Sequence, residues 1–177
     1  DVDQFLGELD RHLADGAIDL VLTSGGVSAG AYEVVREALS SRGVEFVKVA
    51  MQPGGPQGAG RLSGRDVPVV TLPGNPVSAL VSFEVFVRPA LRNAVGHPHP
   101  HRPVVTAKLA ERLESLPGRR QFRRGVLDPV TGTVREVGGP GSHLLAALAR
   151  SDCLIVLPED VVAVDAGETV EVWLLDG

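Results

Sequence analysis

The sequence predicts an α/β domain, built on a parallel sheet with flanking helices, followed by a small, mostly antiparallel β-domain of barrel-like form. Three observations lead to this fold class. Apolar runs of strand length alternate with amphipathic helical segments up to residue 95. The segment GHPHPHRP then changes the composition. Beyond it, short segments such as TAKLA and TVEVW alternate with the period of two that is typical of strands.

The α/β part is expected to contain three strands and three helices. In chain order, these elements are a helix at 3–14, a strand at 17–24, a helix at 32–43, a strand at 44–50, a strand at 67–72 and a helix at 76–95. A loop rich in glycine and proline is expected at 51–66. Asp3 is the candidate N-cap of the first helix, and Pro89 is expected to kink the last one. The strand at 17–24 is a continuous apolar run, as expected if both of its faces are buried.

The predicted domain limits follow from the change in composition. The α/β domain takes residues 1–95, a linker takes 96–102 and the β-domain takes 103–177. Alternating prolines are expected to stiffen the linker. Within the β-domain, DPVTG at 128–132 predicts a hairpin turn, and Ser142 is the expected N-cap of one short helix.

The composition restricts the classes of function. The net charge is −5, so non-specific binding to nucleic acid is not expected. No apolar run approaches the ~20 residues of a membrane span, so no association with a membrane is expected. The single cysteine, Cys153, permits no internal disulfide, which is typical of a cytoplasmic protein, and it is expected to be a core residue.

Glycine-containing loops follow each of the three predicted strands. They are TSGGVSAG (23–30), MQPGGPQGAG (51–60) and LPGNPVS (72–78). Such loops lie at the carboxyl edge of a parallel sheet, where ligands bind, and glycine lets backbone N–H groups turn toward a ligand. In the last loop Asn75 is an expected N-cap and Pro76 an expected first helical residue, and a helix start favours an anion. Each loop alone is also compatible with a simple turn, but two at one edge favour a two-walled anion site.

Three charged side chains accompany these loops. Lys48 lies near the carboxyl end of its strand, where it is either a phosphate partner or a solvated lysine. Glu33 opens the helix after the first loop, as a dipole partner or a metal ligand. Asp1 precedes the first helix, as a cap or a ligand. A carboxylate beside phosphates is suited to holding Mg²⁺.

Two other groups of side chains are given structural roles. The alternating imidazoles of His97, His99 and His101 lie in the predicted linker, where exposure is expected rather than a metal site. The basic cluster RRQFRR at 119–124 is expected to be a solvated strand face, although it could also cover a neighbouring domain or bind phosphate.

Several motifs together resemble one family. DLVLTSGGVSAG, VKVAMQPGGP and LPGNPVSALVSF occur in the order and spacing of the molybdopterin molybdenumtransferases, which include MoeA and the E domain of gephyrin. GSHLLAALARSDCLIVLPED and GETVEVWLL resemble the C-terminal β-domain of that family. The resemblance implies a molybdopterin-binding, MogA-like fold for the first domain. It also implies Mg²⁺-dependent insertion of molybdate into adenylylated molybdopterin, with release of AMP.

The resemblance implies which residues take part. The pterin-binding residues would be Ser24, Gly25, Gly26, Val27, Ser28, Gln52, Pro73, Gly74, Asn75 and Pro76. Glu33 and Asp1 would be the acidic catalytic residues and the metal ligands, and Lys48 matches a catalytic lysine of the family. The sequence departs from the family pattern at Glu33, which replaces an aspartate, and at Gln52 and Gly55, which replace two lysines of the motif KPGKP.

The resemblance also covers assembly. The family's acidic TGDE strand and two N-terminal domains have no counterpart in the sequence, so we expect a C-terminal fragment whose activity on its own is left open. A homodimer is expected, with a molybdopterin adenylyltransferase as a candidate partner. The choice between molybdate and tungstate is also open. The alternative function is a non-catalytic, molybdopterin-binding or scaffold module of gephyrin type.

Overall fold

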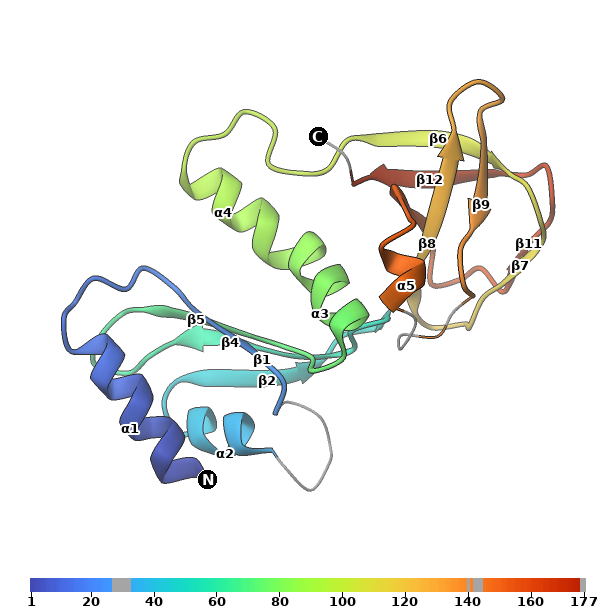
Figure 1. Cartoon of the computed structure of the whole chain (residues 1–177). Coiled ribbons are helices and arrows are strands. Elements are labelled where there is room, and N and C mark those ends of the chain that lie inside the picture. The colour runs from blue at the N-terminus through green and yellow to red at the C-terminus, as the bar shows by residue number, and fades with distance from the viewer. Residues whose placement is uncertain (27–32, 140, 142–144, 176–177) are drawn as a thin grey trace. The chain divides into compact units, whose positions relative to one another are not determined.

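The computed structural model describes residues 1–26, 33–139, 141 and 145–175 (Figure 1). The chain divides into two compact units. Unit 1 comprises Asp1–Val49 and Gly54–Ala79, and unit 2 comprises Ala50–Pro53 and Leu80–Gly177. This division differs from the predicted limits at residues 95 and 103, which stay a prediction of domain organisation.

Unit 1 contains a four-stranded sheet in the order β1-β5-β4-β2. The strands are β1 (Val21–Ser24), β5 (Pro68–Leu72), β4 (Pro56–Arg61) and β2 (Val44–Lys48). β1 and β5 are parallel, whereas β4 is antiparallel to both of its neighbours, so the sheet is mixed rather than wholly parallel. β4 is antiparallel to both β5 and β2, so β2 runs in the same direction as β5 and β1. The carboxyl ends of β1, β5 and β2 therefore lie at one edge of the sheet.

β4 corrects the prediction that residues 51–66 form a loop. Its sequence, PQGAGR, carries no apolar alternation. A Cβ atom on Gly58 would overlap the hydroxyl of Thr71, and one on Gly60 would overlap the carbonyl of Gly43. The strand therefore depends on glycine because neighbouring chain segments approach its backbone closely, a feature that hydrophobic periodicity does not report.

Two helices, α1 (Val2–Leu13) and α2 (Val34–Ser40), pack against one face of this sheet. The buried apolar core of the unit consists of Leu9, Leu13, Ala38, Leu39, Val44, Leu62 and Val69. The N-cap of α1 is Asp1, whose side chain accepts a hydrogen bond from the Gln4 amide at 3.1 Å, and not Asp3 as predicted. β1 is not buried on both faces either, because Leu22 is 45% exposed.

The helical segment after β5 is irregular. It consists of α3 (Pro76–Ser82), one π-helical turn at Phe83–Val87 and α4 (Arg88–Ala94). The irregularity predicted at Pro89 takes the form of this turn, because proline lacks the N–H that would continue the α-helical pattern. No helix among the described residues is long and apolar enough to cross a membrane.

Unit 2 contains a closed five-stranded barrel, as the barrel-like prediction required. The strands, in order around the barrel, are β10 (Cys153–Leu157), β12 (Thr169–Leu174), β6 (Val104–Leu109), β9 (Thr133–Glu136) and β8 (Arg120–Asp128). β10 pairs with both β12 and β8, which closes the ring. All of these pairings are antiparallel except that of β6 with β9.

Smaller elements complete unit 2. β3 (Met51–Gln52) joins β8 in parallel, and β7 (Leu113–Glu114) pairs with β11 (Ala163–Val164). α5 (Leu145–Leu148) lies within the predicted helix, but Ser142 lies outside the described residues. The predicted hairpin turn at 128–132 is confirmed, since the carboxylate of Asp128 accepts the amide of Val130 at 2.9 Å between β8 and β9.

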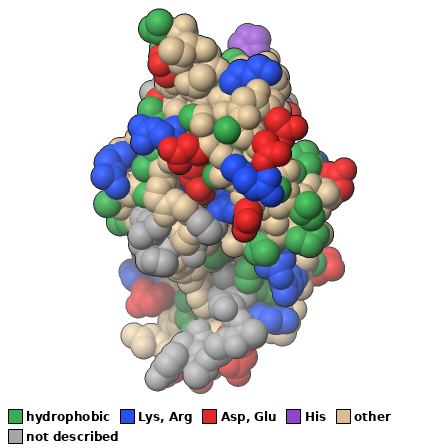
Figure 2. Space-filling view, turned by 90° about the vertical axis from the view of Figure 1, so that its right-hand side faces the viewer, with side chains coloured by type: hydrophobic (Ala, Val, Ile, Leu, Met, Phe, Trp, Pro, Cys, Tyr) green, Lys and Arg blue, Asp and Glu red, His purple; other side chains and the backbone are tan. Residues whose placement is uncertain are grey.

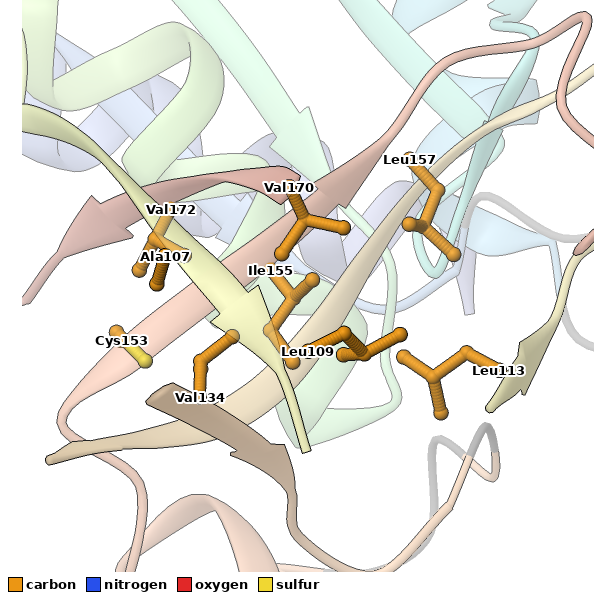
Figure 3. Close-up of a cluster of buried hydrophobic side chains, with 9 residues drawn as sticks. All are labelled: Ala107, Leu109, Leu113, Val134, Cys153, Ile155, Leu157, Val170 and Val172. Carbon is orange, nitrogen blue, oxygen red and sulfur yellow. The ribbon is translucent and has the colours of Figure 1, made fainter. Parts of the chain in front are cut away.

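The barrel interior is filled by aliphatic side chains (Figure 3). The cluster consists of Ala107, Leu109, Leu113, Val134, Cys153, Ile155, Leu157, Val170 and Val172. Cys153 is fully buried in it, which confirms the prediction of a core residue, and burial raises the pKa of its thiol. A Cβ atom on Gly125 of β8 would approach Cys153 Sγ to 3.0 Å, so glycine leaves room for the packed side chains.

The predicted linker is bound to the helical segment of unit 2. Arg92 donates to the carbonyl of His99 at 3.2 Å and also contacts the ring of His97. Arg102 forms two hydrogen bonds with Glu84, at 2.8 and 3.0 Å. The segment 96–102 is thus held by side-chain contacts in addition to the stiffness of its prolines.

Candidate functional site

The two ligand loops predicted at 23–30 and 72–78, which follow β1 and β5, begin side by side. β1 and β5 are neighbouring parallel strands in which Ser24 pairs with Leu72. The amide of Gly25 donates to the carbonyl of Leu72 at 2.9 Å, and the hydroxyl of Ser24 donates to the carbonyl of Pro73 at 3.3 Å. The two loops therefore leave the sheet together at its carboxyl edge, as the prediction of a two-walled site required.

The two loops touch through their glycines. A Cβ atom built on Gly74 would lie 3.1 Å from the Cα atom of Gly25, closer than side chains normally pack. Gly25 and Gly26 have φ values of 96° and 70°, a region that other residues rarely adopt. The sequence indicated flexible backbone at each loop but not this contact between them.

Unpaired amides occur at this edge. Within the described part of the chain, the N–H groups of Gly26, Gly74 and Asn75 donate to no protein acceptor. Gly74 is exposed, while Gly26 and Asn75 are half-buried. These groups can donate hydrogen bonds to an anion. Val27 and Ser28, also predicted to bind, lie outside the described residues.

The start of α3 differs from the prediction. Asn75 is the N-cap, and its side-chain oxygen accepts the amides of Val77 and Ser78 at 3.1 and 3.3 Å. Pro76 has no N–H, and the amide of Ala79 donates to the carbonyl of Asn75. The capping roles of Asn75 and Pro76 are confirmed, but the helix start that was expected to favour an anion has no free amide among the described residues of its first turn. The free donors lie in the loop before it.

Lys48 lies along the same edge. It pairs with Pro56 of β4, and the β4–β5 register places Pro56 level with Pro73. Two strand spacings separate β2 from β5, so the backbone of Lys48 is about 10 Å from that of Pro73. The side chain is exposed and has no partner among the described residues. Its ammonium group can thus extend over the edge to meet a bound anion.

Glu33 and Asp1 supply carboxylates near the starts of α2 and α1. Glu33 occupies the N-cap position of α2 without a side-chain capping bond, and the closest cationic group, on Arg36, is 4.0 Å away. One oxygen of Asp1 is engaged as the cap of α1. No cluster of three metal-binding side chains occurs in the described residues. A carboxylate with an unbound oxygen is the kind of ligand that Mg²⁺ uses together with phosphate oxygens, which is the usual mode for that ion.

Gln52 belongs to the other unit. It lies in β3, where it pairs with Gln121 of the barrel strand β8. Its side-chain oxygen is buried and has no hydrogen-bond donor among the described residues. Unlike the other described residues of the predicted binding set, Gln52 is therefore built into the barrel unit. The sequence did not predict this pairing, because β3 lies inside the segment that was expected to be a loop.

The basic cluster on β8 is not a solvated face. Arg123 and Arg124 are 7% and 3% exposed, and burial lowers the pKa of both guanidinium groups. Arg123 donates to Glu136 at 3.3 Å and to the carbonyl of Glu114 at 2.7 Å. Arg124 donates to the carbonyl of Gly141 at 2.9 Å. These contacts tie β7, β9 and the segment at Gly141 to β8, and only the beginning of the predicted cluster is exposed.

The fold and this edge define a class of proteins: a chain with a mixed α/β unit, whose glycine-containing loops lie together at one sheet edge, and a small β-barrel unit. Comparison with known families names the class more closely. Residues 1–93, more than half of the chain, match the family described as probable molybdopterin binding domain. Residues 106–175 match the MoeA C-terminal region, domain IV. The chain belongs to the molybdopterin molybdenumtransferase (MoeA) family.

Named relatives agree with this assignment. The chain is 58% identical to molybdopterin molybdenumtransferase 2 of Mycobacterium tuberculosis, over 98% of the chain and 44% of the relative. It is 46% identical to molybdopterin molybdenumtransferase 1 of the same organism, over 96% and 42%. The chain thus spans less than half the length of these curated relatives.

Solved structures are also similar. A crystal structure of the molybdopterin biosynthesis MoeA protein from Pyrococcus horikosii matches with a TM-score of 0.75 at 30% identity, over 94% of this chain and 40% of that one. A molybdenum cofactor biosynthesis protein from Pyrococcus furiosus matches with a TM-score of 0.74 at 28% identity, over 98% and 55%.

Proposed function

We propose that the chain is the substrate-binding part of an enzyme that inserts molybdate into molybdopterin during molybdenum cofactor biosynthesis. The observation that carries the proposal is the row of unpaired donors at one sheet edge, formed by the amides of Gly26, Gly74 and Asn75. The names of the M. tuberculosis relatives support the reaction class. They also favour a transferase over the scaffold alternative.

The substrate in this proposal is adenylylated molybdopterin, whose phosphates carry the negative charge that the loop amides recognise. Amides in a turn act as fixed partial charges, and they bind phosphate without the loss of side-chain entropy. The ammonium group of Lys48 adds a mobile positive charge on the same edge. Contact between Gly25 and Gly74 keeps the two loops close enough to hold one ligand.

Mg²⁺ is the proposed metal, held by Glu33 with the second oxygen of Asp1 and completed by phosphate oxygens. When bound, the ion would reduce the negative charge on the phosphates and so favour the departure of AMP. Glu33 has the carboxylate of the family's aspartate with one more methylene. We propose that its position at the start of α2 compensates for that extra length, so that Glu33→Asp keeps the dependence on Mg²⁺.

Calorimetric titration with adenylylated molybdopterin in the presence of Mg²⁺ tests this function. Gly74→Ala is expected to weaken binding about tenfold or more, since the added methyl group pushes Gly25 away. Gly7→Ala is the matched control, because a methyl group there meets nothing within 4 Å. Glu33→Gln should remove the effect of Mg²⁺ on affinity. Equal binding by all three variants, with Mg²⁺ having the same effect in each, would exclude the proposed site.

The assembly belongs to the same proposal. A homodimer in the cytoplasm, with an adenylyltransferase that hands over the adenylylated substrate, is the arrangement that the family assignment favours. Sedimentation equilibrium of the intact protein measures the oligomeric state, and a monomer at concentrations of ~10 µM or above would contradict the dimer.

A further inference from the structure

Most arginines of this protein have partners. Within the described residues, the guanidinium groups of twelve of the fifteen arginines form a hydrogen bond or an ion pair, whereas those of Arg119, Arg135 and Arg150 form neither. Basic and acidic side chains accordingly lie interspersed on the face drawn in Figure 2. An arginine without a counter-charge is thus the exception here.

Two of these three arginines line the same pocket. A surface pocket of about 450 Å³ in unit 2 is lined by Val126, Arg135, Glu136, Val137, Gly138 and Arg150. Pairing with β8 explains why both arginines line one pocket. Val126 of β8 pairs with Arg135 of β9 on one side. On the other side, the segment after α5 is fixed to β8 by the amide of Asp152, which donates to the carbonyl of Gly125 at 3.1 Å.

Two carboxylates near the pocket each have one oxygen in a hydrogen bond. Glu136 accepts from Arg123 at 3.3 Å, and Asp152 accepts from the amide of Leu127 at 3.0 Å. The amide of Gly138, in contrast, has no acceptor among the described residues. The φ of Gly138 is 80°, so its backbone does not continue the extended conformation of β9. The pocket therefore presents two guanidinium groups and one amide as hydrogen-bond donors, beside the carboxylate of Glu136, which is already paired with Arg123.

We propose that this pocket binds a tetrahedral oxoanion, either free or as the terminal group of a phosphate monoester. The planar guanidinium fork matches two oxygens of such an ion, and charge-assisted hydrogen bonds of this kind are the strong ones. The pocket volume lies in the range of ordinary small-ligand sites. The pocket shares no residue with the loops after β1 and β5, and the proposal does not depend on the function assigned to them.

Titration of the 177-residue chain at low salt tests the proposal, with inorganic phosphate, molybdate and AMP as three separate probes. Amide and arginine side-chain NMR signals report the place of binding. The signals of Gly138, Arg135 and Arg150 are expected to move, and they are resolved from Gly74, which reports the other candidate site. Tighter binding of AMP than of phosphate or molybdate would assign a monoester, and the reverse order would assign a free oxoanion.

Variants of the arginines complete the test. Arg135→Gln and Arg150→Gln are each expected to weaken binding at the pocket about tenfold or more. Arg119→Gln is the matched control, since it removes the third unpaired arginine, which does not line the pocket. The thermal midpoint of each variant confirms that it is folded. Failure of all three anions to move the pocket signals, or equal weakening by Arg119→Gln, would overturn the proposal.

Discussion

At the scale of single residues, the candidate site depends on where hydrogen bonds are absent. The side chain of Asn75 accepts the amides of Val77 and Ser78 at the start of α3, whereas the amides of Gly26, Gly74 and Asn75 itself have no acceptor among the described residues. The loop rather than the helix therefore supplies the groups that we propose to bind an anion. Buried backbone N–H groups nearly always have a hydrogen-bond partner, so amides without one are candidates to bind a ligand.

A pH-dependent ion pair is predicted at the same scale. Arg42 donates to both oxygens of Asp10, at 3.0 and 3.1 Å, and this hydrogen-bonded pair lowers the pKa of the Asp10 carboxyl group. A lowered folded-state pKa contributes stability above the unfolded pKa, and that contribution is lost as pH falls through the folded pKa. We expect Asp10→Asn to lower the melting temperature at about pH 6, with the difference from the parent shrinking toward about pH 2.

Thermal unfolding followed by circular dichroism over this pH range measures the effect. Asp15→Asn is the control, since Asp15 is exposed and makes no hydrogen bond or ion pair with the described residues. It should leave the melting temperature unchanged at every pH. A difference between Asp10→Asn and the parent that stays constant on acidification would show that the carboxylate charge is not responsible.

At the scale of elements, β4 is the feature that the sequence concealed. Its glycines allow Gly43, Thr71 and Phe46 to approach the strand closely. We expect Gly60→Ala to destabilise the protein by about 3 kcal/mol or more, because the added methyl group would collide with backbone that has no room to relax. Urea unfolding measures this free energy. Gly7→Ala, in an open helical position, should instead be neutral or stabilising by up to about 1 kcal/mol.

A loss below about 1 kcal/mol in Gly60→Ala would mean that β2 and β4 can separate without cost, which contradicts the ladder between them.

The same elements show what the sequence could predict. α1 and α2 were predicted from the helical period of their apolar residues, and β1, β2 and β5 from apolar runs of strand length. The strands β3 and β4 were missed because glycine and proline normally indicate loops, and here they permit close packing instead.

At the scale of the whole molecule, composition predicted two parts with limits at residues 95 and 103, but it did not indicate the contacts of residues 96–102. The histidine–proline alternation predicted a stiff linker, but it did not indicate that Arg102 of this linker pairs with Glu84 of the helical segment. The family-defining loops were predicted correctly as neighbours, since parallel strands bring their carboxyl ends together. The place of Gln52 and the burial of Arg123 and Arg124 depend on tertiary pairing, which a single sequence does not specify.

The pair of Glu84 and Arg102 yields a prediction for the stability of unit 2. Glu84 is 7% exposed, and Arg88 also approaches it, at 3.7 Å. Glu84→Gln removes the negative charge that two largely buried arginines share, so we expect a destabilisation of about 3 kcal/mol in urea unfolding. Glu159→Gln, which breaks an exposed pair with Arg120, serves as the control and should produce no measurable change. Equal stability of both variants would mean that solvent screens Glu84 as well.

The most direct test of the central claim is a ¹H–¹⁵N NMR titration of the 177-residue chain with AMP and Mg²⁺, followed at the backbone amides. The account predicts that Gly26, Gly74 and Asn75 shift together with one affinity, and that Gly74→Ala weakens all three responses. Unchanged positions for these three amides at saturating AMP would contradict the account, because the loops after β1 and β5 would then not bind phosphate.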